Sequence, residues 1–230
     1  MKEVQAAAHC LTEAAERPIT FARIGVKGRL LKRDEMTRAS RAIFVTCILA
    51  LTTVASMAAD TLEEAVAAYR KADYTTALRI YRSMADQGLA VAQFNVGLMY
   101  DNGQGTSKDE VQAMKWYRLA ADQGRPDAQY QLGHLYYKQD NYAEAAKWFH
   151  LAADQGRADA QSNLGLMYAE GESVPQDFVQ ALMWFTLSAA QHHKDGIENR
   201  DKAAGLMTPA QIAEAQKLAR GWKSTAKPVQ

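Results

Sequence analysis

Apolar residues recur along residues 60–193 with the period of an amphipathic α-helix, and the pattern itself repeats. In each unit a first helix carries Ala-Gln, a Gly four residues after the Gln, and a Tyr three residues after the Gly. A second helix carries Trp followed by another aromatic residue, with Ala three residues before the Trp. The repeated positions are Ala92, Gly97, Tyr100 and Trp116, then Ala128, Gly133, Tyr136 and Trp148, then Ala160, Gly165, Tyr168 and Trp184.

The tetrapeptide Ala-Asp-Gln-Gly closes three of these units, at Ala85–Gly88, Ala121–Gly124 and Ala153–Gly156. A repeat of roughly 30–40 residues, two helices long, is typical of a helical solenoid. The units differ in length mainly between their helices, where the Gly-rich residues 101–106 of one unit give way to the shorter stretch 138–141 in the next. We therefore predict an all-α fold of stacked antiparallel helix hairpins.

The repeated glycine predicts close packing of two helices. Glycine inside a helix costs roughly 1 kcal/mol relative to alanine. Its return at Gly97, Gly133 and Gly165 indicates a contact that a Cβ atom would block. We expect the repeated tryptophans to fill the space between units, so these signature residues are interpreted as structural.

The tail after the repeats predicts two further helices, from about Lys194 to Leu206 and from Thr208 onward. Thr208-Pro209 followed by Gln211 has the spacing of a capping box with proline at the first helical position. Such an atypical last unit is expected to close the core of a solenoid. The apolar face of the last helix comprises Ile212, Ala215, Leu218, Ala219 and Trp222.

The N-terminal part has the order of a secretory signal peptide. Residues 36–41 are positively charged, residues 42–55 are almost wholly apolar or Thr, and small residues follow up to a cleavage site beside Ala59. Because Met36 begins this order, residues 1–35 are interpreted as a non-native extension or a disordered arm. The alternative is a genuine cytoplasmic arm with 42–59 kept as an anchor, although its apolar core is shorter than the roughly 20 residues of a membrane span.

These observations divide the chain into five parts. They are an N-terminal extension (1–35), a signal peptide (36–59), a repeat domain of about four helix pairs (60–193), C-terminal capping helices (194–224) and a tail (225–230).

Composition narrows the function only a little. The chain has 230 residues, 48% of them hydrophobic, and a net charge of +1. Nucleic-acid binding is disfavoured, because it usually needs a strongly basic field. The two cysteines, Cys10 and Cys47, precede the repeats, so no disulfide framework is expected there.

The repeated residues resemble the Sel-one-like repeat, a branch of the tetratricopeptide superfamily. The resemblance rests on Ala92-Gln93-x-x-x-Gly97-x-x-Tyr100 and Ala113-x-x-Trp116-Tyr117-x-x-Ala120-Ala121, with their counterparts in the next two units. It covers about residues 60–191 and implies a right-handed superhelix that acts as a binding scaffold, usually for proteins. Some exported members bridge each helix pair by a disulfide. That subgroup does not fit a chain without cysteine after residue 47.

Chemistry-bearing motifs are scarce. The sequence has no Gly-x-Ser-x-Gly, no P-loop and no dinucleotide-binding glycine pattern. The adjacent His192 and His193 would point apart on a helix, which disfavours a shared metal ion. We therefore expect neither catalytic residues nor a metal, and no cofactor.

The resemblance also suggests a binding surface, because the first helix of each pair lines the groove in tetratricopeptide folds. Amides there could bond a peptide backbone, and rings could bury its side chains. The alternative for each position is ordinary packing between repeats. Residues 90–100 and 126–137 contain no Lys or Arg, which disfavours capture of a C-terminal carboxylate. The candidate groove residues are Phe94, Asn95, Leu98, Tyr130, Gln131, His134, Ser162, Asn163 and Leu166.

The sequence thus predicts a non-catalytic, exported scaffold or adaptor that binds a protein or peptide in the bacterial cell envelope, in the periplasm or outside the cell. It predicts no nucleic-acid partner and no membrane insertion after signal cleavage. One alternative is a cell-wall-related hydrolase or a β-lactam-binding repeat protein. Another is a cytosolic or membrane-anchored co-chaperone-like adaptor.

Overall fold

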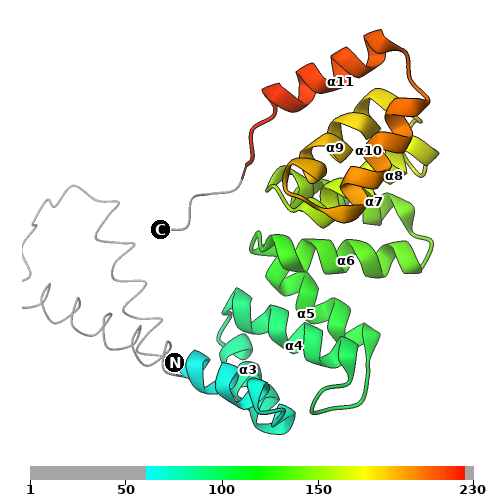
Figure 1. Ribbon diagram of the computed structural model, residues 1–230. Coiled ribbons are helices and arrows are strands. Elements are labelled where there is room, and N and C mark those ends of the chain that lie inside the picture. Colours follow the sequence, from blue (N-terminus) through cyan, green and yellow to red (C-terminus); the bar gives the residue numbers. More distant parts are fainter. Residues whose placement is uncertain (1–60, 226–230) are drawn as a thin grey trace, which may run out of the picture. The chain divides into compact units, whose positions relative to one another are not determined.

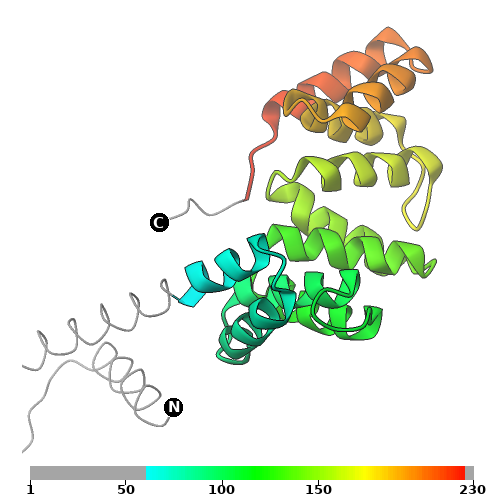
Figure 2. The ribbon, with the colours of Figure 1, turned by 60° about the horizontal axis from the view of Figure 1, so that its bottom comes forward.

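The computed structural model describes residues 61–225, which form helices and connecting turns without any β-strand (Figures 1 and 2). The predicted signal peptide, the extension before it and the last five residues lie outside this described part. Residues 61–70 are helical. The helices that follow are α3 (Tyr74–Asp86), α4 (Ala90–Asn102), α5 (Glu110–Asp122), α6 (Pro126–Lys138), α7 (Tyr142–Asp154), α8 (Ala158–Glu170), α9 (Phe178–Ala190), α10 (Lys194–Gly205) and α11 (Pro209–Gly221).

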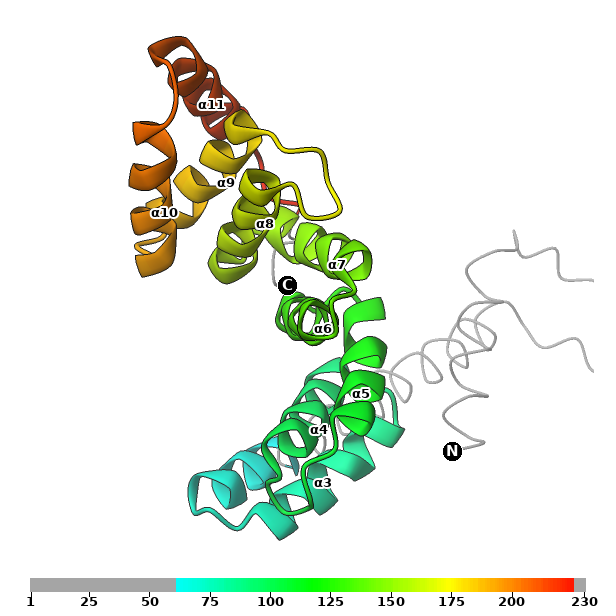
Figure 3. The same cartoon turned by 90° about the vertical axis from the view of Figure 1, so that its right-hand side faces the viewer.

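The helices pack as consecutive hairpins: α4 with α5, α6 with α7, and α8 with α9. The pairs follow one another in order from α3 to α11 (Figure 3). The second helix of each pair starts at an Asp or Asn whose side chain accepts a backbone N–H three residues on, at Asp73, Asp109, Asn141 and Asp177. The predicted all-α solenoid is confirmed.

The repeated glycines lie where the two helices of a hairpin meet, as the sequence predicted. A Cβ atom on Gly133 would lie 2.8 Å from Cδ1 of Phe149, and one on Gly165 would lie 2.6 Å from Cε1 of Phe185. Gly97 faces Tyr117 in the same way. The aromatic residue after each tryptophan therefore fills the interior of its hairpin, and only glycine leaves room for the ring.

The two glutamines of each unit form a relay between helices. Nε2 of Gln129 donates to the carbonyl oxygen of Ala121 at 3.2 Å, and its Oε1 accepts from Nε2 of Gln155 at 2.7 Å. Gln93 with Gln123 and Gln161 with Gln191 repeat this arrangement. Because Gln129 is 4% exposed, these bonds satisfy an amide that would otherwise be buried without partners. The relay explains why Ala-Gln and Ala-Asp-Gln-Gly recur together.

Each repeated tryptophan packs against the preceding unit, again as predicted. Trp148 belongs to a buried cluster with Ala113, Tyr117 and Ala120 of α5. The guanidinium of Arg118 lies 4.8 Å from the Trp148 ring centre and stabilises this contact by a cation–π interaction.

The predicted start of the loop in the second unit is wrong by two residues. Helix α4 continues through Asp101 to Asn102 and ends at Gly103, whose φ of +68° allows the left-handed cap. The loop then folds back on the first unit. Gln104 Oε1 accepts a hydrogen bond of 2.9 Å from the Tyr69 hydroxyl, and a Cβ on Gly105 would collide with the Tyr74 carbonyl oxygen.

The last two helices do not form a regular hairpin. Helix α11 begins with the predicted capping box of Thr208 and Gln211, but it packs against α9 rather than α10. The Trp222 ring meets the edge of Trp184, with 6.4 Å between ring centres. The chain then returns to the end of α7, where the Thr225 N–H donates to the Asp154 carbonyl oxygen at 2.7 Å.

Among the helices of residues 61–225, none combines the length and apolar character that a membrane crossing requires.

Candidate functional site

A small cavity of about 200 Å³ opens between α6, α7 and α8. Its walls are His134 and Tyr137 from α6, Phe149 from α7, and Asn163 and Leu166 from α8. Three of these, His134, Asn163 and Leu166, are among the groove residues that the sequence predicted. We call this cavity the groove pocket.

One wall of the groove pocket differs from the corresponding position of the preceding unit by a hydroxyl. Phe149 holds in α7 the position that Tyr117 holds in α5, directly after the repeated tryptophan. The Tyr117 hydroxyl is buried close to the carboxylate of Asp101, and this burial raises the pKa of the phenol. The corresponding ring of Phe149 lacks the oxygen and presents an apolar wall to the groove pocket.

The polar groups around the groove pocket are uncharged near neutral pH. Burial lowers the pKa of the His134 imidazole, and the nearby Lys138 acts in the same direction, so the ring is neutral. Burial and the Glu172 carboxylate raise the pKa of Tyr137 to about 12, which keeps its phenol protonated. The pocket therefore offers hydrogen-bonding groups and apolar walls to an uncharged side chain.

The other predicted groove residues lie on the same set of first helices. Phe94, Asn95 and Leu98 on α4, and Tyr130 and Gln131 on α6, are all half-buried. The Asn95 side-chain amide donates to the Val91 carbonyl of its own helix at 2.8 Å, which leaves its oxygen as the outward acceptor.

Ser162 does not belong to this surface. Its side chain is 2% exposed, so a bound ligand cannot reach it. The residue stands where α4 and α6 carry Phe94 and Tyr130, and helical spacing alone did not reveal that its short side chain would be covered.

Two arginines at this surface were missed by the sequence reasoning. Arg125 and Arg157 stand just before α6 and α8, outside the stretches that lack basic residues. Their guanidinium carbons lie 5.0 and 5.1 Å from the ring centres of Phe94 and Tyr130. The sequence does contain an indication of these two residues, because an arginine directly follows the closing glycine in both units.

These arginines belong to a ladder of ion pairs along the starts of the first helices. Arg125 pairs with Asp127 at 3.0 Å, and Arg157 pairs with both Asp127 and Asp159. The His193 side chain before α10 extends the ladder, with 2.9 Å between its Nε2 and the Asp159 carboxylate. Since both arginines already face carboxylates, the ladder joins neighbouring units and offers little free positive charge to a ligand.

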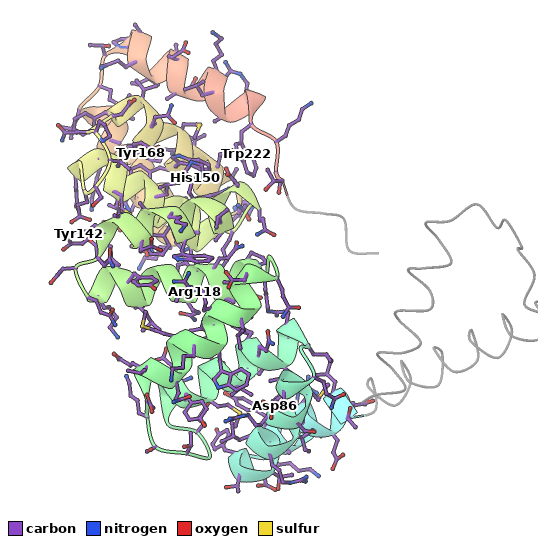
Figure 4. All side chains as sticks on the ribbon, turned by 180° about the vertical axis from the view of Figure 1, so that it is seen from behind. Asp86, Arg118, Tyr142, His150, Tyr168 and Trp222 are labelled. Carbon is purple, nitrogen blue, oxygen red and sulfur yellow. The ribbon has the colours of Figure 1, made fainter. Side chains whose placement is uncertain are left out.

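The second helices of the hairpins carry another series of stacked side chains. Arg118 on α5 covers Trp148, whereas His150 on α7 meets the edge of Trp184 at 5.7 Å between ring centres. Figure 4 labels Arg118, His150 and Trp222 in this series. Within residues 61–225, no group of three or more His, Cys, Asp or Glu side chains is gathered that could hold a metal ion.

A model of the Sel1 repeat matches residues 68–89, 90–124, 126–156 and 158–193. The chain belongs to the Sel1 repeat family. Sel1 repeat proteins generally mediate protein–protein interaction, and the family's scaffold is typically non-catalytic.

The chain is similar to solved Sel1 repeat structures, the first of which supports the fold. The Sel1 repeat protein from Oxalobacter formigenes is 32% identical over 65% of each chain, with a TM-score of 0.55. The Escherichia coli protein c5321, described as a protective antigen of uropathogenic strains with an SLR fold, is 29% identical, with a TM-score of 0.42. The present chain spans 65% of the first protein's length and 41% of the second's. A search of curated proteins gave no match.

Proposed function

We propose that this Sel1 repeat chain is a non-catalytic scaffold that binds an extended segment of a partner protein along α4, α6 and α8. The observation that carries the proposal is the groove pocket. Pockets for drug-sized ligands and cofactors measure about 300–1,000 Å³, whereas this one measures about 200 Å³. It suits a single large apolar or aromatic side chain.

The surroundings of the groove pocket fit the backbone of such a segment. Asn163 and His134 lie at its rim, and Gln131 and Asn95 continue a row of amides towards α4. Amide side chains can donate to and accept from a peptide backbone at the same time. We infer that side-chain burial in the pocket supplies most of the affinity and that the amides fix the register of the segment.

Adding a hydroxyl to the wall of the groove pocket tests the proposal, because it narrows the pocket and makes that wall polar. Phe149→Tyr restores the hydroxyl that Tyr117 carries one unit earlier, so the helix pair keeps a ring already used by this fold. Peptides selected from a random display library against the full chain should bind Phe149→Tyr at least about tenfold more weakly, as expected when a buried anchor contributing over 1.4 kcal/mol is lost.

The reciprocal substitution provides the matched control. Tyr117→Phe removes the corresponding hydroxyl between α4 and α6 and should leave the affinity of the same peptides within about twofold. Isothermal titration measures both variants, and circular dichroism checks that both remain helical. Unchanged binding by Phe149→Tyr would show that the peptide anchors elsewhere.

We further propose that the protein is exported to the bacterial periplasm or cell surface, by cleavage of residues 36–59. The support is the order of charged, apolar and small residues in that segment, which lies outside the described part of the chain. N-terminal sequencing of the protein from its native host should give a first residue beside Ala59. A mature chain that retains residues 36–58 would contradict export by this route.

The scaffold proposal also predicts no turnover of cell-wall fragments or of a chromogenic β-lactam by the purified protein. Hydrolysis that exceeds the buffer rate and survives further purification would favour the hydrolase alternative instead.

A further inference from the structure

The last helix pair lacks the two residues that close each of the three preceding hairpins. The eighth residue of α8 is Gly165, whereas the eighth residue of α10 is Asp201. Likewise the eighth residue of α5 is Tyr117, whereas that of α11 is Gln216. The same register places Leu218-Ala219 at the position of Leu119-Ala120. The pair of helices α10 and α11 therefore has neither the aromatic ring nor the glycine that receives it.

The consequence is an open cavity of about 600 Å³ between α9, α10 and α11. Apolar side chains line it from all three helices, among them Leu182 and Leu187 of α9, Ala204 of α10 and Ile212 of α11. We call it the terminal cavity. Its size lies within the range of about 300–1,000 Å³ that is usual for binding sites.

Exposure shows that this helix pair is closed only in part. Ala203 of α10 and Ala215 of α11 are buried in one cluster with Phe185 of α9, whereas other positions remain open. On α5 the side chains that face α4, including Ala113 and Tyr117, are 0% exposed. Their counterparts on α11 are the half-buried Ile212 and the exposed Gln216. Apolar surface at the end of a solenoid is normally covered by a capping element, and here α11 covers α9 but not α10.

Two arginines line the terminal cavity, and within residues 61–225 only one of them is paired with a carboxylate. Arg200 is bonded to Asp201, with 2.8 Å between its Nη2 and the carboxylate. Arg220, which also lines the cavity, forms no ion pair with any residue of the described part 61–225. A partner that brings a carboxylate to this point would compensate one unpaired positive charge.

We propose that the terminal cavity is a docking site for an acidic helical segment of a partner protein, which inserts one aromatic side chain between α10 and α11. The earlier hairpins indicate which kind of side chain fits this cavity. In three successive pairs the corresponding space is filled by an aromatic ring, from Tyr117, Phe149 and Phe185. A helix that lays an aromatic residue in an apolar groove is a common mode of recognition. This site is separate from the groove pocket and does not depend on it.

The chain itself supplies a probe. A fluorescein-labelled synthetic peptide with the sequence of residues 109–122 carries Trp116 and Tyr117 between acidic ends, and it should bind the full chain saturably with one-to-one stoichiometry. The same peptide with Tyr117→Ala should bind at least about tenfold more weakly. Arg220→Gln in the protein should weaken binding about two- to fivefold, as expected for a partly exposed charge pair.

Closing the hairpin provides the decisive variant. Asp201→Gly with Gln216→Phe restores the missing pair, so an internal ring should occupy the cavity and exclude the peptide, with at least a tenfold loss of affinity. Gln216→Phe alone offers a second filling variant if the double variant is poorly folded by circular dichroism. Fluorescence anisotropy measures every arm.

Phe149→Tyr separates the two proposals, because it alters a wall of the groove pocket and should leave binding of this peptide unchanged. The proposal is overturned if the peptide fails to bind the native chain or binds the filled variants as tightly. Equal binding of the Tyr117→Ala peptide would also overturn it, since no aromatic insertion would then be involved.

Discussion

Replacing Trp184 with alanine is expected to lower the free energy of unfolding by about 3–5 kcal/mol, the usual cost of deleting a buried indole. The Trp184 side chain is 4% exposed and packs in one buried cluster with Ala145 and Phe149 of α7. It also meets the rings of His150 and Trp222. Truncation therefore leaves a cavity at the junction of α7, α9 and α11.

Trp222→Ala is the control for Trp184→Ala. Trp222 is half-buried and touches the same cluster from outside, so its truncation should cost only about 1–2 kcal/mol. Urea unfolding followed by circular dichroism gives both values. Equal losses in the two variants would mean that α11, and not the buried junction, determines the stability of this end of the chain.

Gly165→Ala should destabilise the protein by about 1–2 kcal/mol, although alanine is the better helix former. Helix propensity alone predicts a gain of roughly 1 kcal/mol. Against this, the new Cβ would lie 2.6 Å from Cε1 and 2.7 Å from Cδ1 of Phe185, and such overpacking costs about 1–3 kcal/mol or somewhat more. A lower free energy of unfolding would show that the packing cost exceeds the gain in helix propensity, and a higher one would show the reverse.

The same substitution at Gly205 is the matched control for Gly165→Ala. It lies at the end of α10, and a Cβ added there meets no atom within 4 Å. Gly205→Ala should therefore leave the urea midpoint unchanged or raise it slightly. Adding Phe185→Leu to Gly165→Ala should recover part of the loss, because a smaller side chain gives the methyl group room. A stabilised Gly165→Ala variant would contradict the close contact.

The fold could be predicted from the sequence because the residue types that make its helix contacts recur at the same positions in successive units. Glycine at Gly97, Gly133 and Gly165 has a helix cost that only a close contact offsets, so its regular return predicted the hairpin interior. The sequence did not identify the opposite side of that contact, because only the structure shows that the aromatic residue after each tryptophan faces the glycine. The capping box at Thr208 was equally local and was found.

The site was less accessible to the same reasoning. The groove pocket is lined by residues that differ between the repeats, such as Phe149 in place of Tyr117, and the shared signature does not show such differences. Ser162 was misplaced because the period of a helix gives its direction but not how far neighbouring side chains extend. Arg125 and Arg157 contact Phe94 and Tyr130 from the turns that precede α6 and α8, so a pattern that considers only the first helices omits them.

The fourth unit shows how a role can survive the loss of its motif. Its closing sequence departs from Ala-Asp-Gln-Gly, and glycine is replaced by His192, which has a φ of +60°. Gln191 nevertheless donates to Gln161 at 2.9 Å, as in the other units. The hydrogen bond requires only the glutamine, and the turn tolerates the strain of a non-glycine residue.

The bond from the Thr225 N–H to the Asp154 carbonyl has a consequence for the order in which the chain can be completed during synthesis. The glutamine relays join residues about one repeat apart, so each can form soon after its own unit emerges. The Thr225 bond reaches back about seventy residues, across two helix pairs. An emerging polypeptide can therefore assemble its repeats one at a time, while the end of α7 receives this contact only after two further helix pairs and Thr225 have emerged.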